Sequence, residues 1–287
     1  MEIPRLMLRE KLLEFLKEDV GEGDITTNAL IPPKIEVQAQ IIVKEPAVIA
    51  GVSEMRTFFE MLGIKIINSV EDGDELRRGS IVAEILGDGR SILTAERTVL
   101  NILMRMSGIA TATRKLVKRI RDAGLNVRIA ATRKTAPGLR YFDKRAIVIG
   151  GGDTHRFGLN DAVLIKDNHI RIANGIDEAI KRARSAISFS KKIEVEARTA
   201  DEAVKAAELG VDIIMLDNMT IEEARQSMET LTKKNLRDKV LIEISGEITE
   251  ENILQYARLK PNIISLGALT HSVKAIDMSL EITEVKR

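Results

Sequence analysis

The sequence predicts an α/β protein built from an N-terminal α+β domain of the open-faced sandwich type and a C-terminal β/α barrel-like domain. Two observations carry this prediction. In the second half, short apolar strands alternate with helical stretches about six times, which is typical of parallel pairing in a complete or open barrel. In the first half, strands and helices lack this alternation. We expect domains over 1–110 and 111–271, with a C-terminal helix over 272–287 packing back on the first domain.

The N-terminal domain is expected to begin with a helix over 5–18, because its leucines fall on one side. Residues 36–43 alternate between polar and apolar side chains and predict a strand. A helix over 53–62 and short strands near 64–70 and 81–86 follow.

Residues 91–122 have helical periodicity without a proline, and we expect Gly108 to divide them into two helices. The preceding segment, EDGDELRRGSIVAEILGDG, has the glycine-punctuated chemistry of a hairpin and resembles a lipoyl or biotinyl carrier domain. It lacks the modifiable lysine at a hairpin tip, which disfavours that interpretation.

The C-terminal domain is expected to contain six strands separated by helices. The strands are predicted over 127–132, 161–166, 192–197, 212–217, 240–245 and 262–267, and the helices over 175–187, 200–209, 220–235 and 249–258. The active sites of barrels lie at the C-terminal ends of their strands, so these ends are the positions to inspect for chemistry.

Composition excludes several functions. The net charge of +1 argues against a dedicated nucleic-acid binder. The chain has no cysteine, which excludes disulfides, thiolate zinc sites and cysteine nucleophiles, and its three histidines disfavour a multi-histidine metal site. No apolar run approaches the roughly 18–20 residues that span a bilayer, and no signal peptide is evident, so we expect no membrane partner and a cytoplasmic location.

Charged and small side chains follow the predicted strands in a definite order. Cations come first, then two carboxylates, then small residues; the set comprises Arg133, Lys134, Lys166, Glu196, Asp217, Ser245, Gly246, Gly267 and Ala268. A single charged residue at the end of a strand is usually a solvated loop residue. Charged residues at four successive strand ends favour a functional site. We expect an anionic group at the cations, Mg²⁺ or hydroxyl groups at the two carboxylates, and a phosphate at the backbone N–H groups of the last strands.

The segment between the first two barrel strands adds Arg140, His155 and Arg156 to this basic set. Arginine forks bind carboxylates in a bidentate manner, and a ring with two carboxylates needs about this many donors. An exposed basic loop is the alternative. His155 fits a ligand contact and a buried structural histidine equally well, whereas His169 and His271 fit structural roles better. Residues 150–152, GGG, fit a tight turn better than a phosphate loop.

Several long motifs in the same order resemble the quinolinate phosphoribosyltransferase family, also called nicotinate-nucleotide pyrophosphorylase (carboxylating). They are EDVGEGDITT at 18–27, AERTVLNILMRMSGIAT at 95–111, ATRKTAPGLR at 131–140, GGGDTHRFGLNDAVLIKDNHI at 150–170, IEVEA at 193–197, IIMLDNM at 213–219, ISGEIT at 244–249 and SLGALTHS at 265–272. The resemblance implies a pentosyl-transferring glycosyltransferase of NAD biosynthesis. It would convert quinolinate and phosphoribosyl pyrophosphate to nicotinate mononucleotide, pyrophosphate and CO₂ with Mg²⁺ and no organic cofactor.

The resemblance also implies roles for single residues. Arg133, His155, Arg156 and Lys166 would hold quinolinate, together with Arg97 from a neighbouring subunit of a homo-oligomer, most simply a dimer. Lys134, Lys166, Glu196 and Asp217 would be catalytic. The phosphoribosyl group would also face Lys134, Glu196 and Asp217. Mg²⁺ would bind to the same two carboxylates, Glu196 and Asp217. The phosphate would be cradled by Ser245, Gly246, Gly267 and Ala268. Two positions depart from the family pattern: Glu247 stands where the family usually has glycine, and Thr154 where it often has asparagine. A carboxylate near a phosphate would repel it, so Glu247 weakens the assignment of the phosphate-binding residues.

Three alternatives remain open at this point. A related phosphoribosyltransferase could use another ring acid such as nicotinate. A lyase could form a Schiff base on Lys134 or Lys166. A non-catalytic protein could bind anions without releasing pyrophosphate.

Overall fold

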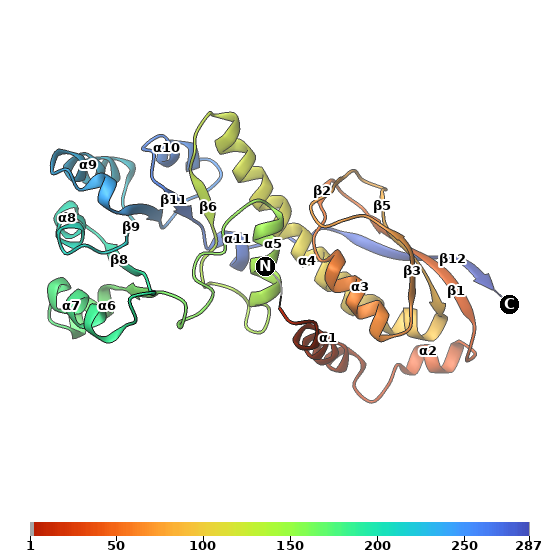
Figure 1. Ribbon diagram of the computed structural model, residues 1–287. Helices are drawn as coiled ribbons and strands as arrows, with labels where there is room; N and C mark the ends of the chain where they lie inside the picture. The colour runs from red at the N-terminus through yellow and green to blue at the C-terminus, as the bar shows by residue number, and fades with distance from the viewer. Residues whose placement is uncertain (1–2, 287) are drawn as a thin grey trace. The chain divides into compact units, whose positions relative to one another are not determined.

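The computed structural model describes residues 3–286 and divides into two compact units (Figure 1). The first unit contains residues 1–114, 136–151 and 272–287, and the second contains 115–135 and 152–271. This division differs from two consecutive domains in two respects: the C-terminal segment returns to the first unit, as expected, and so does a segment from within the second half. Residues 136–151, which lie between the first two strands of the second unit, belong to the first unit.

A four-stranded antiparallel sheet forms the centre of the first unit, in the order β12-β1-β5-β3. Its strands are β1 (Glu36–Val43), β3 (Lys65–Ser69), β5 (Ile81–Asp88) and β12 (Met278–Lys286), and β2 (Ala47–Val48) pairs separately with β4 (Glu75–Leu76). Every second residue of β1 is buried, as the alternating pattern predicted. The helices of this unit are α1 (Arg5–Val20), α2 (Ile25–Leu30), α3 (Val52–Met61) and α5 (Arg140–Ile149).

A single long helix, α4 (Gly89–Asp122), replaces the two helices that we expected around Gly108. The prediction of a break was wrong because Gly108 meets a packing requirement there. A Cβ atom at this position would lie 2.2 Å from the carbonyl oxygen of Lys274. The glycine lets the backbone of the C-terminal segment lie directly against the helix, where Ile276 N–H also donates to the Met104 carbonyl.

The C-terminal segment was expected to form a helix, and this prediction was also wrong. Residues Met278–Lys286 form β12, which pairs antiparallel with the whole of β1. The first six residues, MSLEIT, alternate apolar and polar side chains with the period of a strand, and the register shifts after Ile282. The segment still belongs to the N-terminal unit, with Met278 buried in it.

The second unit contains a six-stranded parallel sheet in the order β6-β11-β10-β9-β8-β7. All six predicted strands are present, as β6 (Arg128–Ala130), β7 (Val163–Ile165), β8 (Ile193–Ala197), β9 (Ile213–Asp217), β10 (Leu241–Ser245) and β11 (Ile263–Ser265). Among the described strands β6 and β7 do not pair with each other, so the barrel is open. The four predicted helices correspond to α7 (Ile176–Ala186), α8 (Ala200–Glu208), α9 (Ile221–Lys233) and the shorter α10 (Ile253–Ala257).

Helices α7, α8 and α9 lie side by side along one face of this sheet (Figure 1). The other face carries the alternate residues of each strand, including Glu194 and Glu196 of β8 and Glu243 and Ser245 of β10. Two short helices, α6 (Asp167–Ile172) and α11 (Ala268–His271), and the 3₁₀ turn η1 (Arg237–Lys239) complete the unit.

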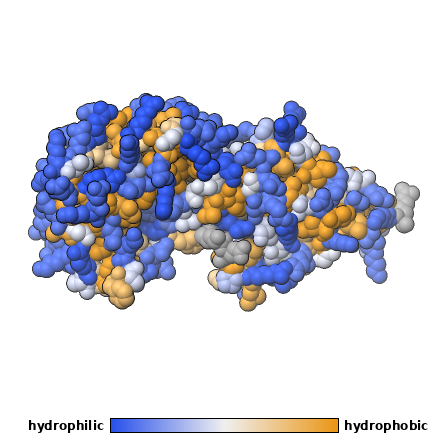
Figure 2. Space-filling view, turned by 45° about the horizontal axis from the view of Figure 1, so that its top comes forward, coloured by the Kyte–Doolittle hydropathy of each residue, from blue (hydrophilic) through white to orange (hydrophobic). Residues whose placement is uncertain are grey.

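Hydrophilic residues cover most of the surface visible in Figure 2, with apolar patches between them. No helix in the described part of the chain combines the length and the apolar character needed to cross a bilayer.

Candidate active site

The carboxyl ends of the six parallel strands border a cavity of about 260 Å³ that lies entirely within the second unit. Eight of the predicted site residues line it: Arg133, Lys134, His155, Arg156, Lys166, Glu196, Asp217 and Ser245. Parallel strands bring their ends to one edge, which is why residues from distant parts of the sequence meet here. Thr132, Leu164, Met215, Asn218, Glu243 and Ser265 complete the lining.

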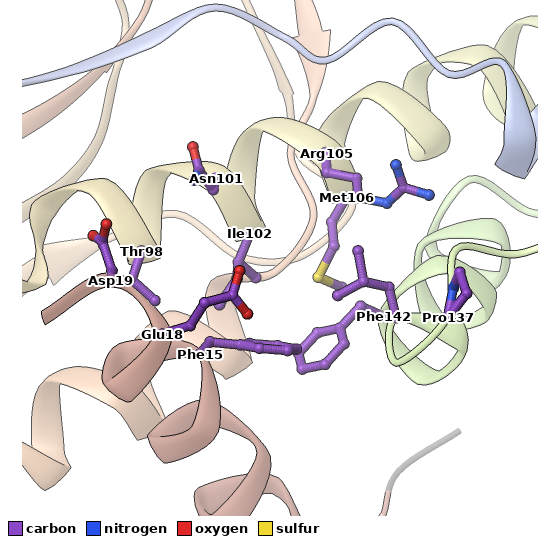
Figure 3. Close-up of a pocket in the computed structure, with 11 residues that line it drawn as sticks. Phe15, Glu18, Asp19, Thr98, Asn101, Ile102, Arg105, Met106, Pro137 and Phe142 are labelled. Atoms are coloured by element: carbon purple, nitrogen blue, oxygen red, sulfur yellow. Dashed lines mark hydrogen bonds between the residues drawn. The ribbon is translucent and has the colours of Figure 1, made fainter. Parts of the chain in front are cut away.

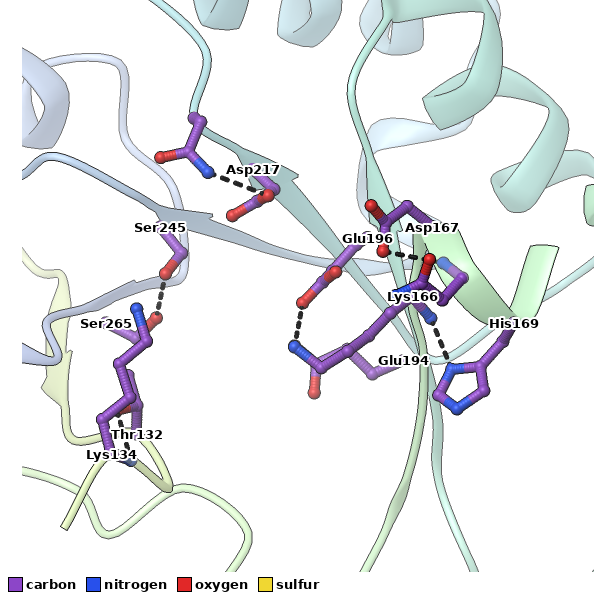
Figure 4. A network of polar contacts seen from close by, with 12 residues as sticks. Thr132, Lys134, Lys166, Asp167, His169, Glu194, Glu196, Asp217, Ser245 and Ser265 are labelled. Carbon is purple, nitrogen blue, oxygen red and sulfur yellow. Dashed lines mark hydrogen bonds and ion pairs between the residues drawn. The ribbon is translucent and has the colours of Figure 1, made fainter. Parts of the chain in front are cut away.

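The predicted catalytic lysine and glutamate contact each other. Lys166 Nζ lies 2.6 Å from Glu196 Oε1, and Figure 4 shows this pair beside Asp217. Asp217 accepts a hydrogen bond of 3.0 Å from the side-chain amide of Asn218, which adopts a left-handed conformation with φ 54°. Glu196 and Asp217 come from the adjacent strands β8 and β9, so two carboxylates and one ammonium group share this part of the cavity.

An anion would meet the guanidinium groups of Arg133 and Arg156. Arg133 Nε is shielded from solvent and has no hydrogen-bond partner within residues 3–286. Burial and the nearby charge of Arg133 lower the pKa of Arg156 from its usual value. Two partly buried cations that repel each other, one with an unpaired N–H group, are suited to a carboxylate or phosphate ligand.

His155 contacts two buried acidic residues that sequence analysis missed. Its Nε2 atom lies 3.1 Å from Glu243 and 3.4 Å from Glu194, whose side chains are 0% and 1% exposed. Burial opposes protonation of His155, but the contacts with Glu194 and Glu243 outweigh it and raise the pKa of the imidazole. Burial, and secondarily the charge of Glu243, raises the pKa of Glu194.

The proton of this cluster can be assigned from geometry. The backbone N–H of Arg156 lies 2.7 Å from His155 Nδ1, which therefore acts as an acceptor. The ring therefore carries a proton on Nε2, which it donates to Glu243.

A chain of hydrogen bonds continues from this cluster across the base of the cavity. The Ser265 hydroxyl lies 2.5 Å from Glu243 Oε1 and 2.9 Å from the Ser245 hydroxyl, and Figure 4 shows the two serines facing each other. Sequence analysis missed Ser265 and Glu243 because they precede or lie outside the residues predicted at the strand ends. Their signal was a polar residue at an inward position of an apolar strand, as in LIEIS and IIS.

The predicted phosphate-binding glycines do not line the cavity directly but occupy crowded positions next to it. A Cβ atom on Gly246, with φ 130°, would lie 2.6 Å from Asn218 Oδ1, and one on Gly267 would lie 2.8 Å from Lys134 Cδ. Ala268 begins α11 and is exposed. Glu247 is exposed and is not among the residues that line the cavity.

Two residues of the predicted set lie in the first unit. Arg97 is exposed on α4, and Arg140 begins α5. Neither is among the residues that line the cavity of the second unit.

The carboxylates of Glu196 and Asp217 fit a hard cation such as Mg²⁺, because each offers oxygen atoms to the cavity and Mg²⁺ usually takes one or two carboxylates plus water or substrate oxygens. The cluster of His155, Glu194 and Glu243 also has the residue types of a metal site. Its imidazole nitrogen already lies within hydrogen-bond distance of a carboxylate, so we interpret this cluster as hydrogen-bonded and not as a metal site.

A larger cavity of about 440 Å³ lies in the first unit, between α1, α4 and α5 (Figure 3). Phe15 and Phe142 line it with ring centroids 5.4 Å apart. Its arginine, Arg105, forms a bidentate ion pair with the buried Asp143. We assign the chemistry to the smaller cavity because it gathers the strand-end cations and carboxylates.

An open β/α barrel with cations and paired carboxylates at its strand ends defines a class of protein suited to small anionic ligands. The chain belongs to the quinolinate phosphoribosyltransferase family. The models for the N-terminal and C-terminal domains of quinolinate phosphoribosyl transferase match residues 24–107 and 109–281.

The sequences of several named relatives can be aligned with this chain over almost their whole length. The chain is 48% identical to the probable nicotinate-nucleotide pyrophosphorylase [carboxylating] of Methanothermobacter thermautotrophicus, over 95% of this chain and 98% of that one. It is 40% identical to the protein of the same name from Bacillus subtilis, over 97% and 94%. The solved structure of the nicotinate-nucleotide pyrophosphorylase from Francisella tularensis matches with a TM-score of 0.90 and 37% identity, over 98% of each chain.

Proposed function

We propose that this protein transfers the phosphoribosyl group of phosphoribosyl pyrophosphate to quinolinate and releases pyrophosphate and CO₂. The product is nicotinate mononucleotide, so the reaction belongs to de novo NAD synthesis. The observation that carries the proposal is one cavity in which cations from the ends of β6 and β7 face carboxylates from the ends of β8 and β9. The names of the relatives support the same reaction.

The basic residues would bind the anionic groups of both substrates. Arg133, Arg156 and Lys166 supply enough N–H donors for the two carboxylates of quinolinate, and the unpaired Nε of Arg133 gives one of them a place to bind. His155 would contribute a hydrogen bond, and Lys134 would contact the pyrophosphate. Charges fixed in this way stabilise the negative charge that develops on departing pyrophosphate.

Glu196 and Asp217 would hold Mg²⁺ and face the ribose hydroxyl groups. When bound, the ion supplies positive charge beside the pyrophosphate oxygens. The carboxylates would also stabilise the positive charge that develops on the ribose as its C1–O bond breaks. Lys166 pairs with Glu196, and its ammonium group would exchange that partner for a substrate carboxylate on binding.

The pyridine nitrogen would displace pyrophosphate from ribose C1. Once ribosylated, the ring nitrogen is positively charged and accepts the electron pair left when the 2-carboxylate departs as CO₂. A proton then replaces the carboxylate at that carbon. The 5′-phosphate would bind backbone N–H groups at Gly246, Gly267 and Ala268 and the hydroxyl of Ser245.

We further propose that the protein is a homodimer with shared sites and acts in the cytoplasm. Arg97 is exposed on α4 and does not line the cavity of the second unit, as expected of a residue that serves the site of another copy. The family resemblance of the AER motif at 95–97 supports this role.

A coupled assay tests the proposed function. Purified protein, Mg²⁺ and phosphoribosyl pyrophosphate are incubated with quinolinate or nicotinate, and pyrophosphate and nicotinate mononucleotide are measured. Product from quinolinate alone is expected. Product from nicotinate would indicate the related transferase, and borohydride trapping of a keto substrate on a lysine would indicate a Schiff-base lyase.

A further inference from the structure

Two buried residues beneath the cavity connect the ring-acid end of the predicted site with its phosphoribosyl end. Glu243 is 0% exposed and Ser265 is 1% exposed, so neither is open to solvent. One oxygen of Glu243 contacts the imidazole of His155, and the other contacts the hydroxyl of Ser265, which in turn contacts Ser245. Four residues, from the segment between α5 and β7 and from β10 and β11, thus form one continuous chain.

The direction of these hydrogen bonds follows from the groups involved. A carboxylate only accepts, so Glu243 accepts from His155 Nε2–H and from the Ser265 hydroxyl. The Ser265 hydroxyl lies within hydrogen-bond distance of two acceptors, Glu243 Oε1 and the Ser245 oxygen, and donates towards both. The proton of Ser245 is then left for the phosphate. The orientation of His155 and that of Ser245 therefore both depend on Glu243.

The conformation of His155 indicates that it needs this support. Its φ of 53° lies in the left-handed region, which costs a non-glycine residue free energy, and it persists only where surrounding contacts determine it. The Asp153 carboxylate accepts its backbone N–H at 2.8 Å, while Glu243 and Glu194 hold the ring. Burying an acidic residue in an otherwise apolar strand also lowers stability unless hydrogen bonds offset the loss of hydration. The presence of Glu243 in such a strand therefore indicates a role for its hydrogen bonds.

We propose that Glu243 and Ser265 are positioning residues, which fix His155 for the ring acid and Ser245 for the phosphoribosyl group without touching either substrate. This inference rests on the proposed function for the identity of the two ligands. The hydrogen-bond chain itself can be tested without turnover.

Steady-state kinetics of Ser265→Ala and Glu243→Gln test the proposal. Ser265→Ala should raise KM for phosphoribosyl pyrophosphate by about threefold to tenfold, the range expected from one neutral hydrogen bond. Its KM for quinolinate should change less than about twofold. Glu243→Gln removes the negative charge to which the His155 ring donates and should raise KM for quinolinate by about tenfold or more. Ser265→Thr keeps the hydroxyl and should restore the wild-type KM.

The control is Ser227→Ala, which removes a hydroxyl that is 1% exposed and donates to the Glu223 carbonyl within α9. It should lower stability without moving either KM. Equal KM shifts in Ser227→Ala and Ser265→Ala, or KM values within twofold of wild type in both cavity variants, would overturn the proposal.

A spectroscopic measurement separates this inference from the proposed function. The chain has three histidines, so the ring nitrogens of His155 can be resolved in ¹H–¹⁵N NMR spectra. Glu243→Gln should shift the His155 ring signals, and Ser227→Ala should leave them unchanged. Unchanged signals in Glu243→Gln would refute the positioning role. If the wild type did not convert quinolinate, the proposed function would fail, and these signals alone would decide the inference.

Discussion

Arg156 and Lys134 test the site at the scale of single residues. Both line the cavity. Arg156→Ala and Lys134→Ala should each abolish measurable turnover while leaving folding intact, because each removes a cation that would bind a substrate anion. Turnover and circular dichroism are the measurements.

The matched control is Arg182→Ala, which removes an exposed arginine that pairs with Glu178 on α7. It should retain full activity. Activity of either cavity variant within about threefold of wild type, a difference under about 1 kcal/mol, would remove that residue from the site.

Asp217 and Glu196 give a prediction about the metal. Asp217→Asn keeps the size of the side chain but removes a charged oxygen ligand. The Mg²⁺ concentration that gives half-maximal activity should rise by about tenfold or more, a loss of roughly 1.4 kcal/mol in binding. EDTA should abolish the activity of the wild type. A variant with the wild-type Mg²⁺ dependence would show that Asp217 does not hold the ion.

Gly108 determines how one element packs, because it lets the backbone of α4 lie against the backbone of the C-terminal segment at Lys274. Alanine normally stabilises a helix interior by about 1 kcal/mol relative to glycine. Gly108→Ala should instead destabilise the protein by about 1–3 kcal/mol, because the new methyl group would overlap the Lys274 carbonyl. Urea unfolding measures this change.

Asn101→Ala is the control for Gly108→Ala, since Asn101 is exposed on the same helix. It should be neutral or slightly stabilising. Equal or greater stability of Gly108→Ala would mean that the close approach of the C-terminal segment to α4 is absent.

The C-terminal strand gives a second prediction for an element. A chain ending at Asp277 lacks β12 and exposes the hydrogen-bonding edge of β1. It should aggregate or unfold at lower temperature than the full chain, because an unpaired strand edge is prone to pair with other chains. Glu281→Ala removes the exposed ion pair with Lys44 and an exposed hydrogen bond from Ser279, and should change stability by less than about 0.5 kcal/mol. A truncated chain as stable as this variant would contradict the role of β12.

Secondary structure was predicted correctly where the local hydrophobic period determines it. The predictions failed where contacts with a distant segment of the chain determine the structure. The six strands of the second unit were predicted because apolar runs alternate with helices. The break at Gly108 was wrong because the reason for this glycine, the backbone of Lys274, lies far along the chain. The predicted C-terminal helix was wrong although MSLEIT carries the period of a strand, completed by pairing with β1.

The lining of the cavity was predictable where a polar residue ends a strand, as at Lys166, Glu196 and Asp217. Because barrel active sites lie at the C-terminal ends of the strands, the residues at those ends are the first candidates. Glu243 and Ser265 lie one layer deeper or at the end of a short strand, where polar groups are normally excluded. Their partners come from other strands, so neither residue could be connected to His155 or Ser245 from the sequence alone.

At the scale of the whole molecule, the proposed sharing of sites can be tested by mixing two inactive variants. Arg97→Ala and Lys134→Ala should each be inactive alone. In a dimer with one copy of each, one of the two sites would contain both wild-type residues. Random mixing should therefore restore about one quarter of wild-type activity. Failure to recover activity, with mixed dimers verified by mass spectrometry, would exclude a shared site.

The central claim is that one cavity joins ribosylation of the pyridine nitrogen to loss of the neighbouring carboxylate. The most direct test uses quinolinate labelled with ¹³C in its 2-carboxylate, together with phosphoribosyl pyrophosphate and Mg²⁺. We expect labelled CO₂ and pyrophosphate in equal amounts, and unlabelled nicotinate mononucleotide. Pyrophosphate release without labelled CO₂, or no release from quinolinate at all, would contradict this claim.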